Sequence, residues 1–429
     1  MTPVDPQRAR QFAVEVVSRL REAGFAALWA GGCVRDHLLG LEPADYDVAT
    51  DATPEQIRAV FGRRRTLAIG QAFGVITVLG PAGAGQIEVA TFRSDHGYSD
   101  GRHPDQVKFC SAQQDAQRRD FTINGMFFDP LSGQVVDYVG GQDDLRRGLV
   151  RAIGYPTARF REDKLRMLRA VRFTATFQFM IDPATLAAVQ RHAAEIVAVS
   201  AERIAAELQR MLVHKHRVHA VELLAESKLL PAMLPELQDV AAVSAGGVSA
   251  DWKNTLAILR VVETTRFAVA FAALIRAAVR RSPQGIGSVE PLCQRLKMAV
   301  ADRKAIEFLL EHESAVRAAR SLPWPRLQRI LIQNPAADLL DYGRAVAAVL
   351  DGHTADIDHA AERFALPPDQ LNPSPLITGD DLRRLGIPTG PAYKGILDGV
   401  RDAQLEQRIH SAGEALEMAR RLFVRGHVT

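Results

Sequence analysis

Asp45 and Asp47, which stand one residue apart, are the residues of this chain best placed to do chemistry. They fall on a predicted strand, where side chains alternate between the two faces, so both carboxylates are expected on the same side and can share a metal ion. Glu88 lies on a later predicted strand and supplies a third carboxylate if that strand pairs nearby. Hard oxygen ligands favour Mg²⁺, and two such ions clamp the attacking and leaving oxygens of a phosphoryl transfer. A polar strand at a solvent-exposed sheet edge is the alternative interpretation of this pair.

A pair of glycines upstream weakens that alternative. Gly31 and Gly32 follow an apolar run at residues 25–30 and lead into a short helical segment at 33–39. Glycines let a phosphate approach the backbone closely, and amides at the start of a helix attract anions. Arg35 is positioned to bind a triphosphate through its guanidinium fork. A diglycine corner is often only a turn, but a strand, a diglycine, an arginine and an Asp-x-Asp in close succession are far more specific.

Residues 118–124 form a third segment whose side chains could take part in chemistry. Arg119, Asp120 and Asn124 surround two apolar side chains in this run. The segment is interpreted either as part of the same site or as a turn with buried anchors.

Residues 162–173 form a fourth segment, predicted to be one continuous helix. Asp163, Arg166, Arg169 and Arg172 recur every three residues and share one face of it, opposite an apolar face. A salt-bridged, solvated helix face is the alternative interpretation.

The elements that must position these residues change in type along the chain. Short β-rich runs and one capped helix occupy the first 150 residues, which predicts a mixed α+β part. The predicted strands are 25–30, 46–49, 75–79 and 87–92, and Thr53 is expected to cap a helix that begins at Pro54. From about Pro156 the pattern is helical, with caps expected at Asp182 and Ser200. Boundaries are expected near residues 150, 215 and 350.

Composition narrows the class of protein. The 429 residues include 53 Lys and Arg against 50 Asp and Glu, a formal charge of +3, and 47% of the residues are hydrophobic, which is ordinary globular composition. The three cysteines show no CxxC pairing or metal-type clustering, so a reducing cytoplasm is expected. Neither a signal peptide nor a transmembrane run is found in the sequence, so no membrane association is expected. No obligate protein partner is indicated.

The four segments GGCVRDHLLG…DYD, IEVATFR, RRDFTING and EDKLRMLRAVRF, in this order and spacing, resemble class II tRNA nucleotidyltransferases and the related bacterial poly(A) polymerases. The resemblance extends through SAERIAAELQRML (200–212) and TGDDLRRLGIPTGP (378–391), whereas residues 216–350 match only in outline. It implies a polymerase-β-like nucleotidyltransferase head (1–150), a helical neck with a base-reading helix (151–215), a helical body (216–350) and a helical, tRNA-binding tail (351–429).

The resemblance also implies roles for individual residues. Asp45 and Asp47 would hold the catalytic Mg²⁺ ions, with Glu88 as a third catalytic carboxylate. The nucleotide would be bound by Gly31, Gly32, Arg35, Arg119, Asp120, Asn124, Asp163, Arg166, Arg169 and Arg172. An Asp acceptor beside an Arg donor accepts cytosine and adenine and rejects uracil and guanine, because the first two bases pair an exocyclic amine with a ring-nitrogen acceptor.

Several activities share this head in the family, and the sequence favours one. The implied activity is template-independent addition of C, C and A to the tRNA 3′ end, at the acceptor arm, from CTP and ATP. The polar stretch 93–109, with Gly97 and Gly101, is interpreted as a mobile loop of the kind that accompanies A incorporation. A basic stretch typical of poly(A) polymerases is missing from 70–75. An enzyme that adds only the terminal A remains the main alternative, and a poly(A) polymerase is a weaker one.

Two other possibilities are disfavoured by the residues present. Some relatives carry a His-Asp phosphohydrolase in the body, but Arg276 and Ala277 stand where His and Asp would be, and Asn254 replaces a possible ligand His, so no hydrolase activity is expected. A non-catalytic RNA-binding protein would have no reason to retain all the acidic residues. An antibiotic or protein nucleotidyltransferase would not need the base-reading helix or the tail.

Overall fold

The computed structural model describes residues 4–96, 106–244 and 247–425. It divides into two compact units, Met1–Gln238 and Asp239–Thr429, and each is described by itself. Among the described residues, no helix combines the length and the apolar character that crossing a bilayer requires.

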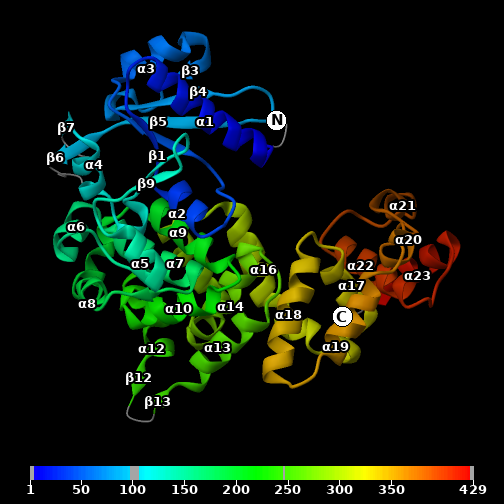
Figure 1. The fold of residues 1–429 in the computed structure, drawn as a ribbon. Helices are drawn as coiled ribbons and strands as arrows, with labels where there is room; N and C mark the ends of the chain where they lie inside the picture. Colours follow the sequence, from blue (N-terminus) through cyan, green and yellow to red (C-terminus); the bar gives the residue numbers. More distant parts are fainter. Residues whose placement is uncertain (1–3, 97–105, 245–246, 426–429) are drawn as a thin grey trace. The chain divides into compact units, whose positions relative to one another are not determined.

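A seven-stranded mixed sheet lies at the centre of the first part of unit 1 (Figure 1). In spatial order its strands are β3 (Thr66–Leu67), β4 (Val75–Leu79), β5 (Gln86–Thr91), β2 (Asp47–Thr50), β1 (Ala27–Ala30), β8 (Phe127–Asp129) and β9 (Gln134–Val136). The central pair β2 and β5 is parallel, whereas the other neighbours are antiparallel. This sheet and the helices that follow confirm the predicted α+β class.

The two faces of the sheet are covered by different helices. Trp29 is fully buried and donates its indole N–H to the Ala13 carbonyl of α1 at 3.3 Å, so α1 packs on the face to which Trp29 points. Ala30, Ala49 and Ala116 belong to a core on the opposite face, which α4 covers. The helices that surround the sheet are α1 (Pro6–Glu22), α2 (Gly32–Leu38), α3 (Pro54–Phe61), α4 (Ala112–Arg118) and α5 (Gly141–Arg147).

Local sequence signals predicted several element boundaries. Helix α3 begins at Pro54, and Thr53 and Gln56 form a reciprocal capping box in front of it. Asp182 caps α8 with its carboxylate, and Ser200 directly precedes α9. Strand β4 has the predicted bounds, and the other three predicted strands are found with bounds that differ by one or two residues. In particular, Asp45 lies in a bend before β2, so the prediction that both aspartates occupy a strand was wrong for Asp45.

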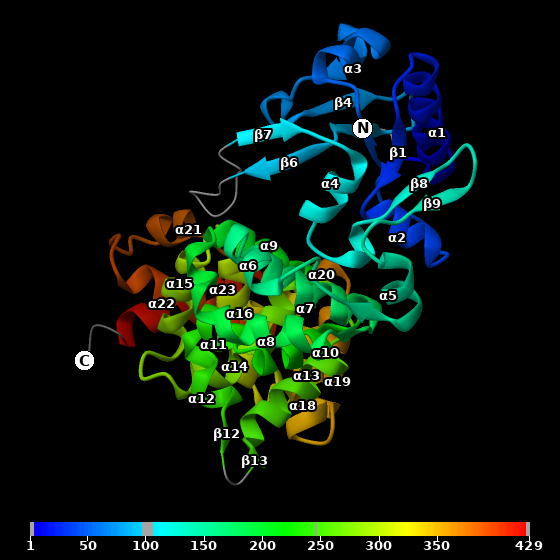
Figure 2. The same cartoon turned by 60° about the vertical axis from the view of Figure 1, so that its left-hand side comes forward.

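The stretch 93–109, predicted as a loop, has ordered ends. Strands β6 (Arg93–His96) and β7 (Gln106–Phe109) pair antiparallel as a hairpin beside α4 (Figure 2). Gly97 and Gly101 lie outside the described residues. The prediction of a loop was therefore wrong for the two strands, and the prediction of mobility stays a prediction.

The rest of unit 1 is mainly helical. Its helices are α6 (Pro156–Glu162), α7 (Leu165–Phe177), α8 (Pro183–His192), α9 (Ala201–Leu212), α10 (Arg217–Glu226) and α11 (Leu229–Met233), and α12 (Gln238–Ala241) follows at the unit boundary. A short parallel pair, β10 (Leu149–Val150) and β11 (Met180–Ile181), interrupts them. Helix α7 packs against both α9 and α10.

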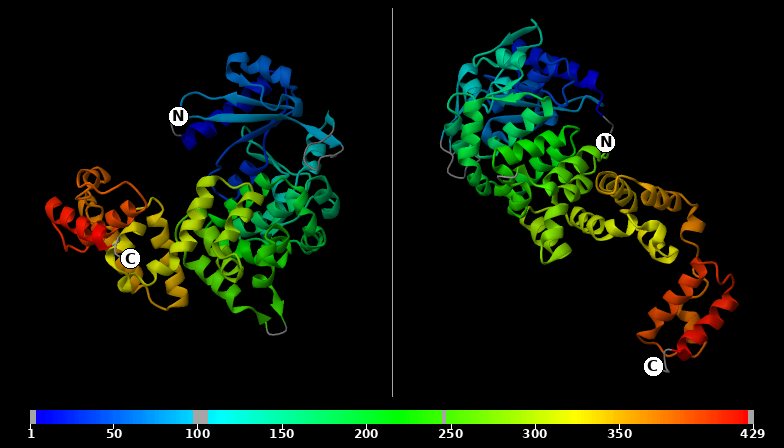
Figure 3. Two further views of the ribbon diagram at one scale, coloured as in Figure 1. Left: turned by 180° about the vertical axis from the view of Figure 1, so that it is seen from behind. Right: turned by 90° about the horizontal axis from the view of Figure 1, so that it is seen from below.

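Unit 2 is helical apart from the short pair β12 (Val243–Ser244) and β13 (Gly247–Val248). Its helices are α13 (Ala250–Val261), α14 (Phe267–Arg281), α15 (Val289–Arg295), α16 (Val300–Val316), α17 (Trp324–Leu331), α18 (Ala336–Leu350), α19 (Ala355–Phe364), α20 (Pro368–Leu371), α21 (Gly379–Arg384), α22 (Ala392–Leu405) and α23 (Ala412–Arg425). Helices α21 to α23, orange to red in Figure 3, pack against one another. Their buried residues, which include Leu382, Val400 and Ala419, form a core of their own.

A buried carboxylate lies at the centre of the α14, α16 and α18 packing. Glu313 on α16 has no exposed surface, and its oxygens accept hydrogen bonds from Arg276 at 2.7 and 2.8 Å, Arg280 at 3.0 Å, Arg317 at 2.9 Å and Tyr342 at 3.2 Å. Burial raises the pKa of Glu313, but the arginines outweigh that effect and the net pKa is lowered. Arg276, at the place where the sequence lacks a His-Asp pair, is thus an ion-pair partner within the core.

Glu313→Ala should destabilise unit 2 by roughly 3–5 kcal/mol, because Arg276 is left buried without its counter-charge. Urea unfolding followed by circular dichroism measures this loss. Glu311→Gln is the matched control on the same helix, because Glu311 is exposed and such surface substitutions change stability by about 0.5 kcal/mol or less. Equal midpoints for Glu313→Ala and the control would contradict the role given to this network.

Candidate active site

A pocket of about 540 Å³ in unit 1 gathers nearly all of the residues singled out in the sequence. It is lined by Gly31, Gly32, Arg35, Asp45, Asp47, Arg118, Arg119, Asp120, Asn124, Asp163, Arg166, Arg169, Arg172 and Phe173. Every predicted site residue except Glu88 is in this lining. Segments as far apart in sequence as residues 31–47 and 163–173 therefore meet at one place.

The glycine corner between β1 and α2 requires glycine at its first position. Gly31 has φ 76° and ψ −129°, a conformation that side chains rarely adopt. A Cβ atom there would also lie 3.0 Å from Nη1 of Arg119. The missing side chain lets the Arg119 guanidinium approach this turn.

Strand register places two carboxylates of the site, Asp47 and Glu88, side by side. Asp47 pairs with Glu88 across the parallel strands β2 and β5, so the two side chains are neighbours on the same face. Burial raises the pKa of Asp47, and the charges of Asp45 and Glu88 add to this and bring it to about 6, against an opposing effect of Arg119. The sheet therefore holds acidic groups close together in spite of their mutual repulsion.

Arg35 is held by two side chains. Its Nη1 donates to Oδ1 of Asn124 at 2.7 Å, and its Nη2 lies 2.7 Å from Oδ1 of Asp36. Asn124, in the 3₁₀ turn η3 (Thr122–Asn124), in turn donates to Asp120 at 3.1 Å. The 118–124 run is thus both a turn with buried anchors and part of the pocket wall.

Asp120 joins this chain of hydrogen bonds to α7. Its Oδ2 lies 2.7 Å from Nη2 of Arg169. Burial acts to raise the pKa of Asp120, but Arg169 and the Asn124 amide outweigh it and lower the pKa to about 2. Asp120 therefore remains a negatively charged partner for Arg169 throughout the physiological pH range.

Two consecutive arginines share one buried carboxylate. Asp115, on α4, accepts hydrogen bonds from Arg118 at 2.7 Å and from Arg119 at 2.9 Å, and it is only 1% exposed. It also accepts the backbone N–H of Arg93 at 3.2 Å. Burial acts to raise the pKa of Asp115, and the two arginines lower it overall. Asp115 fixes both guanidinium groups at the pocket wall.

The predicted continuous helix 162–173 is broken at its acidic residue. Helix α6 ends at Glu162, Asp163 is extended with φ −143°, and α7 begins at Leu165. The Asp163 carboxylate accepts the Leu165 N–H at 3.0 Å, a local bond with which short Asp side chains compete against helical geometry. The prediction that Asp163 lies on the helix face with the arginines was therefore wrong, although it lines the same pocket.

Arg166 and Asp163 have different partners. Arg166 lies 2.6 Å from Glu162 and donates to the Arg118 carbonyl at 3.1 Å. Asp163 is bound instead by Arg203 of α9, at 2.9 Å. The two residues expected to contact the base are thus each anchored separately.

Phe173 brings three guanidinium groups together. The carbon centres of Arg172, Arg35 and Arg169 lie 4.1, 5.1 and 5.1 Å from the centroid of its ring. Arg172 also lies 2.6 Å from Glu207, which is 2% exposed. Three guanidinium groups this close to one aromatic ring favour an anionic ligand in the pocket.

The sequence analysis missed several of these residues. Arg118 and Phe173 line the pocket, and Asp115, Arg203 and Glu207 hold its arginines and Asp163. The one available signal was the 200–212 segment, whose Arg203 and Glu207 stand four residues apart and so share a helix face.

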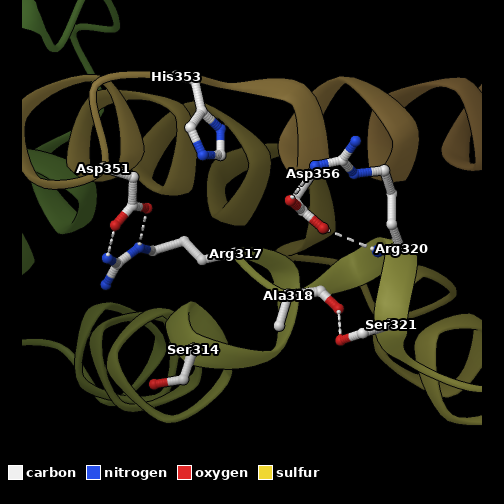
Figure 4. A pocket seen from close by; sticks show the side chains of 8 residues that line it. All are labelled: Ser314, Arg317, Ala318, Arg320, Ser321, Asp351, His353 and Asp356. Carbon is white, nitrogen blue, oxygen red and sulfur yellow. Dashed lines mark hydrogen bonds and ion pairs between the residues drawn. The ribbon is translucent and has the colours of Figure 1, made fainter.

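A larger cavity, of about 840 Å³, lies in unit 2 and has a different character (Figure 4). Arg317 lies 2.5 Å from Asp351, and Arg320 lies 3.0 Å from Asp356. Its cations and carboxylates are present in equal number and paired with each other. The larger volume of this cavity therefore does not make it the candidate active site.

Comparison with protein families matches two parts of unit 1. Residues 27–151 match the poly A polymerase head domain, and residues 178–240 match the domain described as the probable RNA- and SrmB-binding site of polymerase A. The CCA-adding enzyme of Limosilactobacillus fermentum is 43% identical over 215 residues, 50% of this chain and 52% of that protein. The matched part of the chain thus spans about half the length of this relative.

Other relatives align over nearly the whole chain. The CCA-adding enzyme of Lacticaseibacillus paracasei is 33% identical over 405 residues, 92% of this chain and 91% of that protein. The crystal structure of the Bacillus stearothermophilus CCA-adding enzyme in complex with CTP superposes with a TM-score of 0.78 at 26% identity, over 98% of this chain and 99% of that chain. The Thermotoga maritima CCA-adding enzyme complexed with tRNA shares the fold, with a TM-score of 0.66 at 19% identity. The chain belongs to the family of CCA-adding enzymes, the class II tRNA nucleotidyltransferases that its four motifs resemble.

Proposed function

We propose that this protein adds C, C and A to the 3′ end of tRNA from CTP and ATP, without a template, by metal-assisted phosphoryl transfer. The observation that carries the proposal is the single pocket in which the acidic pair Asp45 and Asp47, a set of arginines and Asp163 come together. The names of the full-length relatives support CCA addition over poly(A) synthesis or addition of A alone.

The residues present fit a divalent cation. Enzymes of this family generally need one, and Mg²⁺ is our specific proposal. The crowding that raises the pKa of Asp47 is the kind of repulsion that a bound cation relieves. Mg²⁺ commonly takes one or two carboxylates and completes its shell with water and substrate phosphates, so the pair Asp45 and Asp47 would be enough to hold it.

Asp45 and Asp47 would hold the metal, and Glu88 beside Asp47 adds negative charge that favours it. When bound, the metal neutralises charge on the transferring phosphoryl group and activates the attacking 3′ hydroxyl. The chain's own contribution is to orient the triphosphate. Six arginines line the pocket, and their guanidinium N–H groups can donate to the phosphate oxygens of a polyanionic substrate.

Base selection is assigned to Asp163 and Arg166. A carboxylate accepts the exocyclic amine of cytosine or adenine, and a guanidinium donates to the neighbouring ring nitrogen. Uracil and guanine present the opposite pattern, so both contacts fail with them. Anchoring of each residue by its own partner supports a fixed template made of protein.

The assignment of regions accompanies this proposal. A nucleotidyltransferase head at 1–150, a neck at 151–215, a body at 216–350 and a tRNA-binding tail at 351–429 remain our working division, and the poly A polymerase head match that ends at residue 151 supports its first boundary. We also propose a cytoplasmic location, where tRNA, CTP and ATP are available and the free cysteines stay reduced.

Product sizing on three tRNA substrates tests the activity. With CTP and ATP, tRNAs that end in the discriminator base, in C and in CC should gain three, two and one nucleotides, because a single pocket serves all steps. Extension of the CC-ended substrate alone would indicate an A-adding enzyme, and long A tails would indicate a poly(A) polymerase.

Asp45→Ala should abolish all three additions while tRNA binding persists, because the metal site and not the core is lost.

Asp47→Asn should stabilise the metal-free protein at pH 8. The folded-state pKa of Asp47 is raised to about 6 from 3.8, so its charge opposes folding as the pH rises through that range. The gain should be about 1 kcal/mol, because solvent in the pocket screens much of the repulsion. Calorimetry in EDTA should show the difference in unfolding midpoint shrinking as the pH falls below 6. Added Mg²⁺ should raise the midpoint of the wild type and not that of the variant; the same response in both would contradict the metal site.

Asp163→Ala should relax selection against UTP and GTP. Each unsatisfied polar group in the wild-type complex with a wrong base costs roughly 1–3 kcal/mol, or about 5- to 150-fold in discrimination. The kcat/KM values for CTP, ATP, UTP and GTP on one tRNA measure the effect. Asp143→Ala is the control, because Asp143 is an exposed partner of Arg146 on α5 outside the pocket. Ratios that stay unchanged in Asp163→Ala would return this carboxylate to a purely structural role.

A further inference from the structure

Helix α9 contacts both the break that carries Asp163 and the body of α7. Arg203 reaches Asp163 in the break before α7, and Glu207 reaches Arg172 in the body of α7. The two α9 residues stand four positions apart, so they share one face of that helix. Helix α9 therefore supplies the cation of one ion pair and the anion of the other.

Arg203 binds the Asp163 carboxylate in a bidentate manner. Nη1 of Arg203 donates to Oδ1 at 3.3 Å and Nη2 donates to Oδ2 at 2.9 Å, a fork geometry that a guanidinium provides. Both side chains are largely buried, with 22% and 17% of their surface exposed. The plane of the carboxylate is therefore set by Arg203, and the Leu165 N–H at 3.0 Å to Oδ1 restrains it further.

This arrangement distinguishes the two oxygens of Asp163. A carboxylate offers about four acceptor positions. Within the described part of the chain, Oδ1 accepts from both Leu165 and Arg203, whereas Oδ2 accepts from Arg203 alone. Oδ2 thus keeps an acceptor position for a ligand in the pocket that Asp163 lines.

We infer that Arg203 is a positioning residue for nucleotide selection, which orients Asp163 so that Oδ2 receives the exocyclic amine of cytosine or adenine. Glu207 supports the body of α7, because it fixes Nε of Arg172 at 2.6 Å. The inference rests on the proposed function. It adds that selectivity depends on a residue that the base does not touch.

Arg203→Lys tests this inference. Lysine keeps the charge, but its ammonium group cannot reproduce the fork, so the carboxylate loses its fixed plane. Discrimination between CTP and UTP, and between ATP and GTP, measured as ratios of kcat/KM, should fall roughly tenfold. Arg203→Gln removes the charge and shortens the side chain, so its amide falls short of the carboxylate, and it should give the same loss independently. Arg210→Ala is the matched control on the same helix, because Arg210 is 63% exposed and pairs with Glu207 rather than with Asp163.

A double-mutant comparison separates positioning from simple stabilisation. In an Asp163→Ala background, Arg203→Lys should cause no further change in the nucleotide ratios, because its effect passes through Asp163. A residue that only stabilises the α7 and α9 packing would lower the unfolding midpoint and slow all four nucleotides equally. Unchanged ratios in both folded Arg203 variants would overturn the inference. Failure of the wild type to extend tRNA would instead overturn the proposed function.

Discussion

The pairing of the arginines with buried carboxylates is the interaction on which the pocket depends. Six guanidinium groups line one cavity, and three of them surround the ring of Phe173. Such a cluster would repel itself in the absence of a nucleotide. Asp115, Asp120 and Glu207, all largely buried, offset that repulsion at fixed places. The carboxylates contribute little net stability as buried pairs, but they hold the arginines in one arrangement before a substrate arrives.

Strand register provides the second constraint. Parallel pairing of β2 with β5 places Asp47 opposite Glu88, and the same register puts Ala49 opposite Ala90. The face that carries Asp47 is therefore the face whose inner part packs on α4. A shift of one residue would turn Asp47 towards α1 and bring Val48 to the site, so the apolar pattern of the strand fixes the position of the acidic residue.

Signals that are local in sequence were predictable, and contacts between distant segments were not. The capping residues Thr53 and Asp182 and the glycine corner could be identified because the cause lies within a few residues. The break at Asp163 was missed because three-residue periodicity fits a continuous helix equally well. The Arg203 contact spans 40 positions, and the spacing of Arg203 from Glu207 on one helix face does not reveal which residue Arg203 contacts. The acidic pair and the basic segments were found from residue types, whereas the pairing that organises them required the fold.

The same pairing limits how the arginines meet a ligand. Arg172 gives its Nε to Glu207, and Arg169 gives Nε and Nη2 to Asp120, so each guanidinium is anchored by one edge. A guanidinium has five N–H donors, so an anchored edge leaves others for phosphate oxygens. The anchoring occupies some of the N–H donors of each arginine and also restricts the rotation of its side chain. Under the proposed function one triphosphate position serves two different bases, and fixed donors then let selection depend on the base edge and not on the placement of the phosphates.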